Sequence, residues 1–275
     1  MISNIGIMQG RLVPREIKSR LQSFPKKNWK KEFSLAKKYG IKFIEWTVDY
    51  KNFNYNPIIN NLDSVVKVSK KEKINITSVT ADFFMQKPFF KKKNRNVKTI
   101  QYLKKLIVSC NILKIKYIIL PLVDNSSINN LEEENIVVNE LLNLNIYLKS
   151  KNLKILFEID YKPKKISKFI NRFNNNFGIN YDTGNSASLN FSFKQEKKYF
   201  SKVYNIHVKD RELNGPSVRL GQGNLKIENL LEHLNRINYK GNLILQTYIP
   251  KSNKNVLSET LINYNYLIKK LNNIK

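Results

Sequence analysis

The sequence predicts an α/β protein built as one (β/α)8 barrel. Eight short apolar segments recur along the 275 residues, and each is followed by a longer polar or amphipathic segment. This alternation is typical of a parallel sheet whose strands are joined by helices, and eight units in about 250 residues match a closed barrel. No segment has the composition of a linker, so a single domain over residues 1–275 is expected.

The predicted strands are short and rich in β-branched and aromatic residues. An open doubly wound sheet is the alternative that the same alternation allows. That fold usually carries a glycine-rich turn after its first strand, whereas "QGRLVP" follows the first strand here and lacks the dinucleotide fingerprint. The strands are predicted at residues 4–8, 42–48, 74–80, 115–123, 153–159, 177–182, 203–209 and 242–248.

The segments between the strands show helical periodicity. Trp29, Phe33 and Ala36 would share one face of a helix over residues 28–40, which ends at Gly40 as helices commonly do. Further helices are predicted over residues 61–73, 97–113, 135–152, 228–241 and 258–271.

The composition points to a soluble, cytoplasmic protein. The start of the chain lacks the pattern of a signal peptide, and no apolar stretch approaches the ~18 residues of a membrane span. The single cysteine, Cys110, excludes a disulfide framework and is expected in the core. A membrane partner is therefore not expected.

The net charge of +28 suggests nucleic-acid binding at first sight. Lysine is spread over the whole chain, however, which indicates a general bias of composition rather than a basic patch. The densest basic run, residues 87–98, is interpreted as a solvated loop and helix start, with contact to an anionic substrate or weak contact to nucleic acid as the alternatives. We therefore expect no nucleic-acid partner.

Polar side chains stand at the ends of four consecutive predicted strands. Glu158, Asp182, His207 and Gln246 occupy these places in strands five to eight, where barrel enzymes have their active sites. An unpaired buried glutamate is costly, so Glu158 in an apolar run indicates a partner. Two carboxylates, an imidazole and an amide oxygen at equal depth predict a divalent-cation site, and this oxygen-rich set suits Mn²⁺, Mg²⁺ or Co²⁺.

Several motifs resemble those of the sugar phosphate isomerase/epimerase family, which comprises xylose isomerase-like TIM barrels related to D-tagatose 3-epimerase and hydroxypyruvate isomerase. The resemblance spans nearly the whole chain and is most specific from residue 155 onward. The motifs are "IGIMQGRL" (5–12), "SFP" (23–25), "IEW" (44–46), "NYDTGNSASL" (180–189), "IHVKDR" (206–211), "GQGN" (221–224) and "LQT" (245–247).

The resemblance implies one divalent cation, usually Mn²⁺, with Mg²⁺, Co²⁺ or Zn²⁺ as alternatives, held by Glu, Asp, His and Glu. Glu158, Asp182 and His207 match three of these positions, and Gln246 stands where the family's epimerases carry a second glutamate. In those enzymes the two glutamates also move protons on opposite faces of the substrate. Metal binding is therefore expected here, and two-base epimerisation is not.

Gln246 changes the charge of the predicted site. Two carboxylates with a neutral imidazole and amide balance a divalent cation, whereas a second glutamate would leave surplus negative charge. The amide would make the metal a stronger Lewis acid, weaken its retention and favour an anionic oxygen on the substrate. It cannot serve as a base, and the alternative is that Gln246 only hydrogen-bonds a loop.

Two residues are the predicted catalytic groups. Glu158 would abstract a proton beside a carbonyl, with the metal stabilising the resulting enediolate. Lys209 is the candidate second acid/base or oxyanion partner, because desolvation beside a metal can lower the pKa of a lysine. An ordinary exposed lysine is the alternative for Lys209.

Four residues of the first half of the chain are candidates for substrate binding. Gln9 and Arg11 follow the first strand and could bind hydroxyls or a phosphate, although a structural ion pair is equally open for Arg11. Glu45 lies late in strand two and Asp82 follows strand three. These two could bind sugar hydroxyls or support the site indirectly, or be structural.

Two further candidates lie in the second half. Asn185 stands where related epimerases have a substrate-binding histidine. Arg219, with the amides of the "GQGN" loop, could cradle an anion, and a plain turn is the alternative. His233 lies in a helical pattern and is expected at the surface.

The predicted function is a metal-dependent isomerase or epimerase of a small sugar, keto-sugar or sugar phosphate. A metal-dependent dehydratase of a keto-polyol and a non-catalytic sugar-binding barrel are the alternatives. A nucleic-acid enzyme of the endonuclease IV type needs a trinuclear zinc cluster, which two histidines cannot supply. Assembly into a homo-oligomer is suggested only by analogy.

Overall fold

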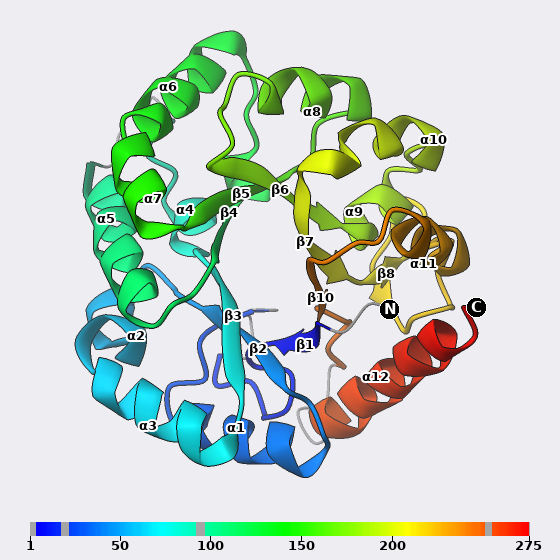
Figure 1. Cartoon of the computed structure of the whole chain (residues 1–275). Helices are drawn as coiled ribbons and strands as arrows, with labels where there is room; N and C mark the ends of the chain where they lie inside the picture. Colours follow the sequence, from blue (N-terminus) through cyan, green and yellow to red (C-terminus); the bar gives the residue numbers. More distant parts are fainter. Residues whose placement is uncertain (1–3, 18–21, 92–96, 251–254, 275) are drawn as a thin grey trace.

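The computed structural model describes residues 4–17, 22–91, 97–250 and 255–274. Its centre is a closed barrel of eight parallel strands with helices around it (Figure 1). The strands follow one another in chain order, and β1 (Ile5–Met8) pairs with both β2 (Phe43–Thr47) and β10 (Asn242–Leu245) to close the barrel. The (β/α)8 barrel predicted from the sequence is confirmed.

All eight predicted strands are present in the barrel. A short antiparallel pair, β8 (Asp210–Arg211) and β9 (Ser217–Val218), follows the seventh of them. The other barrel strands are β3 (Asn75–Thr80), β4 (Tyr117–Leu122), β5 (Lys154–Ile159), β6 (Phe177–Asp182) and β7 (Val203–Val208).

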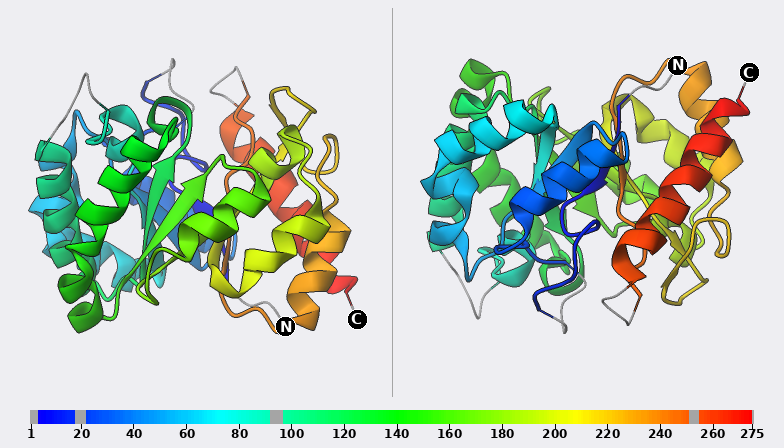
Figure 2. Two further views of the ribbon diagram at one scale, coloured as in Figure 1. Left: turned by 90° about the horizontal axis from the view of Figure 1, so that it is seen from above. Right: turned by 90° about the horizontal axis from the view of Figure 1, so that it is seen from below.

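The helices lie outside the strands, as the side views show (Figure 2). Asparagines begin three of them, because Asn56, Asn61 and Asn130 each accept a backbone N–H of the first turn. The α-helices are α1 (Trp29–Lys38), α2 (Pro57–Asn60), α3 (Leu62–Glu72), α4 (Phe83–Gln86), α5 (Val97–Ile112), α6 (Leu131–Leu142), α7 (Asn145–Lys151), α8 (Pro163–Ile170), α9 (Thr183–Ser188), α10 (Phe193–Glu196), α11 (Ile227–Arg236) and α12 (Val256–Asn272). Short 3₁₀ helices are η1 (Phe53–Tyr55), η3 (Asp124–Ser126) and η4 (Lys197–Lys202).

The single helix predicted over residues 135–152 is wrong, because two helices, α6 and α7, occupy this part of the chain. The N–H of Leu144 bonds to the carbonyl of Leu141, three residues back, so the backbone tightens into a 3₁₀-type turn between them. Leu141, Leu144 and Leu148 are all buried. Their i, i+3, i+7 spacing is that of one helical face, so the three leucines stay on the core side across the turn.

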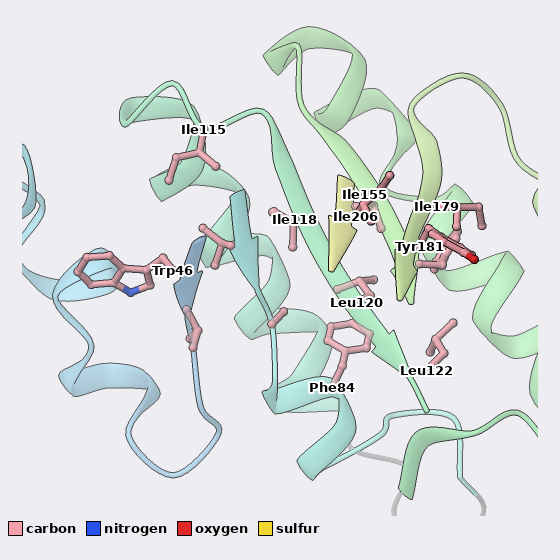
Figure 3. Packing of buried hydrophobic residues seen from close by; sticks show 14 of the residues in the cluster. Trp46, Phe84, Ile115, Ile118, Leu120, Leu122, Ile155, Ile179, Tyr181 and Ile206 are labelled. Atoms are coloured by element: carbon pink, nitrogen blue, oxygen red, sulfur yellow. The ribbon is translucent and has the colours of Figure 1, made fainter. Parts of the chain in front are cut away.

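The main hydrophobic core lies between the barrel and the helices (Figure 3). Ile118, Leu120 and Leu122 alternate along β4 and belong to this core. Because side chains alternate along a strand, these residues face outward and the residues between them face the barrel interior. Cys110 of α5 is fully buried in the same core, as predicted.

An aromatic cluster joins α1 to the outer face of β2. Trp46 is fully buried, and its ring centroid lies 5.3 Å from that of Phe24 and 5.4 Å from that of Trp29. Its indole nitrogen donates a hydrogen bond of 2.9 Å to Asn56 Oδ1, so the polar end of the ring is satisfied. Trp29 and Phe33 lie on the buried face of α1, as predicted.

The inner faces of several strands are polar, in contrast to their outer faces. Side chains two apart share a face, so the polar residues of β2, β3, β6 and β7 alternate with residues of the outer core. In these four strands, the buried polar residues of the inner face are Glu45, Thr47, Ser78, Thr80, Asn180, Asp182, Asn205 and His207. A polar interior must satisfy its own hydrogen bonds, and this requirement shapes the site described below.

Three further expectations from the sequence can be compared with the structure. No described helix has the length and hydropathy needed to cross a bilayer. Phe89 and Phe90 of the basic run are buried, while residues 92–96 of that run lie outside the described residues. The surface position expected for His233 is wrong, because the ring is 7% exposed and packs edge-on against Phe193 and Phe200.

Candidate metal centre and active site

Glu158, Asp182 and His207 come together on the inner face of the barrel. They lie on the neighbouring strands β5, β6 and β7, and Asp182 pairs directly with His207 in the parallel register. Each offers one ligand atom, and the three atoms lie within 4.8 Å of one another. All three side chains are buried, so the arrangement forms a compact donor set of two carboxylates and one imidazole.

The ring of His207 lies between two carboxylates. Nε2 is 2.6 Å from Oε1 of Glu45, and Nδ1 is 2.9 Å from Oε2 of Glu158. Glu45 is fully buried and is itself held by the hydroxyls of Ser78 and Thr80, each at 2.6 Å. Because Nε2 faces Glu45, Nδ1 is the nitrogen directed toward the other two members of the cluster.

Two asparagines complete the network inside the barrel. Asn205 Nδ2 donates to Oε2 of Glu45 at 3.0 Å and to Oδ1 of Asn180 at 2.7 Å. Asn180 Nδ2 in turn donates to Oε2 of Glu158 at 3.0 Å. The two amides thus connect the carboxylate of Glu45, beside Nε2 of His207, with the carboxylate of Glu158, beside Nδ1.

The charges of this cluster shift one another's pKa values. Burial alone would lower the pKa of His207, but Glu45 and Glu158 raise it to about 10. Burial and the charge of Asp182 raise the pKa of Glu158 above its usual value, and His207 and Lys209 oppose this rise. A carboxyl group with a raised pKa is a better proton acceptor than an ordinary one.

Lys209 lies directly after β7 and reaches Asp182. Its Nζ is 2.8 Å from Oδ2 of Asp182 and 3.2 Å from Oε1 of Gln246. Burial alone would raise the pKa of Asp182, but Lys209 and His207 hold it below its usual value. Gln246 is therefore connected to the three-residue cluster through the ammonium group of Lys209.

Gln22 was not predicted, and it extends this chain of contacts across the mouth of the barrel. Its Oε1 accepts a hydrogen bond of 2.9 Å from Nε2 of Gln246, and its Nε2 donates one of 3.0 Å to Oδ2 of Asp82. Asp82 is buried, and burial together with Asp49 raises its pKa well above the usual value. Gln22 follows no strand directly, so the pattern of strand ends did not point to it.

Gln9 and Arg11 are buried in the turn after β1. Gln9 Oε1 accepts the N–H of Thr47 at 3.1 Å, and Arg11 Nε donates to the carbonyl of Thr247 at 3.2 Å. Glu32 of α1 accepts the N–H groups of Gly10 and Leu12 around Arg11. Burial lowers the pKa of Arg11 to about 10, against the opposing effect of Glu32.

The groups expected to cradle an anion already have protein partners. Arg219 makes two hydrogen bonds to the carboxylate of Glu259, and Gly221 and Gly223 donate their N–H groups to Oδ2 of Asp210. The contacts favour the alternative of a structural turn, so Arg219 is not carried into the proposed site. Asn185 is half-buried, and its backbone N–H donates to Oδ1 of Asp182.

The three clustered residues could hold a divalent cation. Asp182 Oδ2 is buried, and within the described residues it makes no hydrogen bond of good geometry. Its 2.8 Å contact with Lys209 Nζ meets the distance of a hydrogen bond without the angle, so we regard it as an ion pair. A buried carboxylate oxygen held by an ion pair rather than a hydrogen bond, beside a second carboxylate and an imidazole, fits a cation such as Mn²⁺ or Zn²⁺.

Comparison with known proteins agrees with this architecture. The family model described as "Xylose isomerase-like TIM barrel" matches residues 33–265. The chain belongs to the xylose isomerase-like TIM barrel family. A search of curated proteins gave no match.

Solved structures share the fold of this xylose isomerase-like barrel over nearly its whole length. A xylose isomerase domain protein from Planctomyces limnophilus is similar with a TM-score of 0.76 and 15% identity, covering 98% of each chain. The IOLI protein, solved with a bound zinc atom, gives a TM-score of 0.76 and 17% identity over 99% of each chain. An L-ribulose 3-epimerase gives 0.73 and 13% identity, covering 98% of this chain and 95% of that one.

Proposed function

We propose that this barrel is a divalent-metal-dependent isomerase or epimerase that acts on a small sugar, keto-sugar or sugar phosphate. The observation that carries the proposal is the cluster of Glu158, Asp182 and His207 within 4.8 Å on the inner face of the barrel. Active sites of such barrels lie at this end of the strands. The zinc in the IOLI structure and the epimerase activity named for L-ribulose 3-epimerase support the same class.

Glu158, Asp182 and His207 Nδ1 would hold the metal, and Mn²⁺ is the ion we favour. A divalent cation bound there would supply positive charge that stabilises the negative oxygen formed when a proton leaves the neighbouring carbon. Glu45 keeps the imidazole oriented, because its carboxylate holds Nε2 and leaves Nδ1 for the cluster. In this proposal Glu45 is a positioning residue rather than a group that touches substrate.

Glu158 is the proposed base. Burial and the charge of Asp182 raise its pKa in the metal-free site, and a bound cation would oppose this rise. Asn180 donates to one of its oxygens, so the orientation of the carboxylate is fixed by the neighbouring strand. The proton that leaves the carbon beside the carbonyl would pass to Glu158, and the substrate would continue as an enediolate.

Lys209 and Gln246 border the proposed site beside Asp182. The ammonium of Lys209 can donate a proton or a hydrogen bond to an oxygen that becomes negative, whereas the Gln246 amide cannot accept the proton in place of a carboxylate. The proposed site therefore uses one carboxylate base and one cationic group, where the related epimerases use two glutamates as bases. Gln9, Arg11, Asp82 and Asn185 surround the same end of the barrel and are the proposed contacts for substrate hydroxyls.

The decisive experiment is proton exchange in heavy water. The metal-stripped chain is reloaded with Mn²⁺ and incubated with ketoses, keto-acids and their phosphates, and deuterium incorporation is followed by NMR. We expect the Glu158→Gln variant to lose activity about 10²-fold or more, without rescue by excess Mn²⁺. Glu196→Gln is the matched control, because Glu196 is also buried but hydrogen-bonds Tyr181 outside the barrel.

Each outcome separates the proposed reaction from its alternatives. Near-normal exchange in Glu158→Gln would end its role as the base. A product that contains one water less than the substrate would identify a dehydratase that uses the same base. The lack of a carboxylate at position 246 is compatible with that reaction as well. Metal uptake without exchange on any tested compound would favour a sugar-binding barrel.

A further inference from the structure

The backbone and the aliphatic stem of Lys209 are held in place by neighbouring residues. The hydroxyl of Thr183 accepts the N–H of Lys209 at 2.8 Å and also donates to its carbonyl, which fixes the backbone after β7. The aliphatic stem lies over Gly184, where an added Cβ would come within 2.5 Å of Cε. Glycine at this place leaves room for the stem, and 16% of the Lys209 side chain is exposed.

Only one oxygen of Asp182 is open to a cation. Oδ1 accepts the N–H of Asn185 at 2.9 Å, in the first turn of α9. Oδ2 has no hydrogen bond of good geometry within the described residues and lies 2.8 Å from Nζ of Lys209. A metal at the cluster and the ammonium group would therefore compete for the same oxygen.

Gln246 offers the ammonium a second partner. Its Oε1 lies 3.2 Å from Nζ, so Lys209 can keep one hydrogen bond when it leaves Asp182. The amide itself is held in place, because its Nε2 donates to Oε1 of Gln22. A carboxylate at this position would pair strongly with Lys209, whereas a neutral amide holds it weakly and leaves it free to return.

We propose that Lys209 is an internal cation that competes with the metal for Oδ2 of Asp182, and that it leaves Asp182 and keeps its contact with Gln246 when the metal binds. This inference rests on the proposed metal-dependent function. Without the metal, Lys209 compensates the charge of the buried Asp182, which would otherwise be costly to leave unpaired. The consequence is a site that binds its metal reversibly and weakly compared with the same three ligands alone.

The test measures metal affinity directly and does not depend on turnover. Mn²⁺ binding to the metal-stripped full chain is followed by isothermal titration calorimetry and by the electron paramagnetic resonance signal of free Mn²⁺. In Lys209→Met and Lys209→Gln we expect binding to tighten about tenfold or more, since one charge-assisted contact is commonly worth that factor. Lys240→Met, which removes an exposed lysine, should bind like the unaltered chain.

The two lysine variants keep the test decisive if one of them folds poorly, and circular dichroism identifies such a case. Equal Mn²⁺ affinity in the unaltered chain and in the folded Lys209 variants would overturn the competition and leave the metal site standing. Tighter binding in Lys240→Met by the same factor would also overturn it, because net charge alone would then explain the effect. Absence of Mn²⁺ binding in every variant would instead overturn the proposed function.

Discussion

His207 Nε2 lies 2.6 Å from Oε1 of Glu45, although 162 positions separate the two residues in the sequence. The pair connects β7 with β2 through the interior of the barrel, and Ser78 and Thr80 of β3 hold the same carboxylate. Three side chains from two strands thus fix the imidazole of His207. Such a support decides which nitrogen faces the predicted ligands, and that choice governs metal affinity.

Replacement of Glu45 by Gln should weaken Mn²⁺ binding. The amide keeps the size of the side chain but loses the charge that holds Nε2 of His207, so the ring gains orientations in which Nδ1 no longer faces Glu158. We expect the affinity to fall about 10- to 100-fold, as measured by calorimetric titration.

Glu72→Gln provides the control for this change, because Glu72 is a largely buried glutamate of α3 on the outside of the barrel. Its affinity for Mn²⁺ should equal that of the unaltered chain. If Glu45→Gln folds normally and binds Mn²⁺ as tightly as the control, Glu45 has no part in orienting the ligand.

Glu32 should make the stability of the fold depend on pH. It is fully buried, accepts the N–H groups of Gly10 and Leu12, and burial raises its pKa from 4.5 to about 7. Since the folded state binds the proton more tightly than the unfolded state, the contribution of this group is greatest below pH 4.5. It is lost as the pH rises through 7, and it amounts to at most about 3 kcal/mol.

The measurement compares urea unfolding of the unaltered chain and of Glu32→Gln between pH 5 and pH 8. The variant cannot titrate at this position. The free energy of unfolding of the unaltered chain, relative to that of the variant, should therefore be larger at pH 5 than at pH 8. Other titrating groups cancel in the difference. A difference that stays constant over this range would show that Glu32 has an ordinary pKa.

The fold was predictable because its signals are local and repeated. Each strand carries its own run of β-branched residues, and the burial of Ile118, Leu120 and Leu122 on one face of β4 follows from simple alternation. The division between α6 and α7 was not predictable in the same way. The periodicity of residues 135–152 continues through the break, so the pattern of buried positions does not indicate it. The turn is visible only in the backbone, where the N–H of Leu144 bonds to the carbonyl of Leu141.

From the sequence, only those residues of the candidate site that stand at the ends of strands could be predicted. Glu158, Asp182 and His207 stand late in three adjacent strands, and their convergence follows once the barrel is recognised. The contacts of Lys209 with Asp182 could not be read in this way, because they depend on the direction of a long side chain. For Arg219 the sequence left an anion site and a plain turn open, and its contacts with Glu259 favour the plain turn.

Gln22 connects two sides of the barrel mouth without touching the three clustered residues. Its amide donates to Asp82 at 3.0 Å and accepts from Gln246 at 2.9 Å, so it fixes two side chains that border the proposed substrate. Gln22→Leu removes both hydrogen bonds at similar volume. Because each is worth about 1 kcal/mol, we expect the KM for the substrate identified by proton exchange to rise about 5- to 30-fold.

The same variant should bind Mn²⁺ within about twofold of the unaltered chain, which calorimetry can show, since no predicted ligand loses a direct contact. Gln195→Leu, in which an exposed glutamine of α10 is replaced, is the control and should change neither quantity. A fall in Mn²⁺ affinity that parallels the rise in KM would place Gln22 in the support of the metal through Gln246 and Lys209. An unchanged KM would show that Gln22 has no part in positioning the substrate.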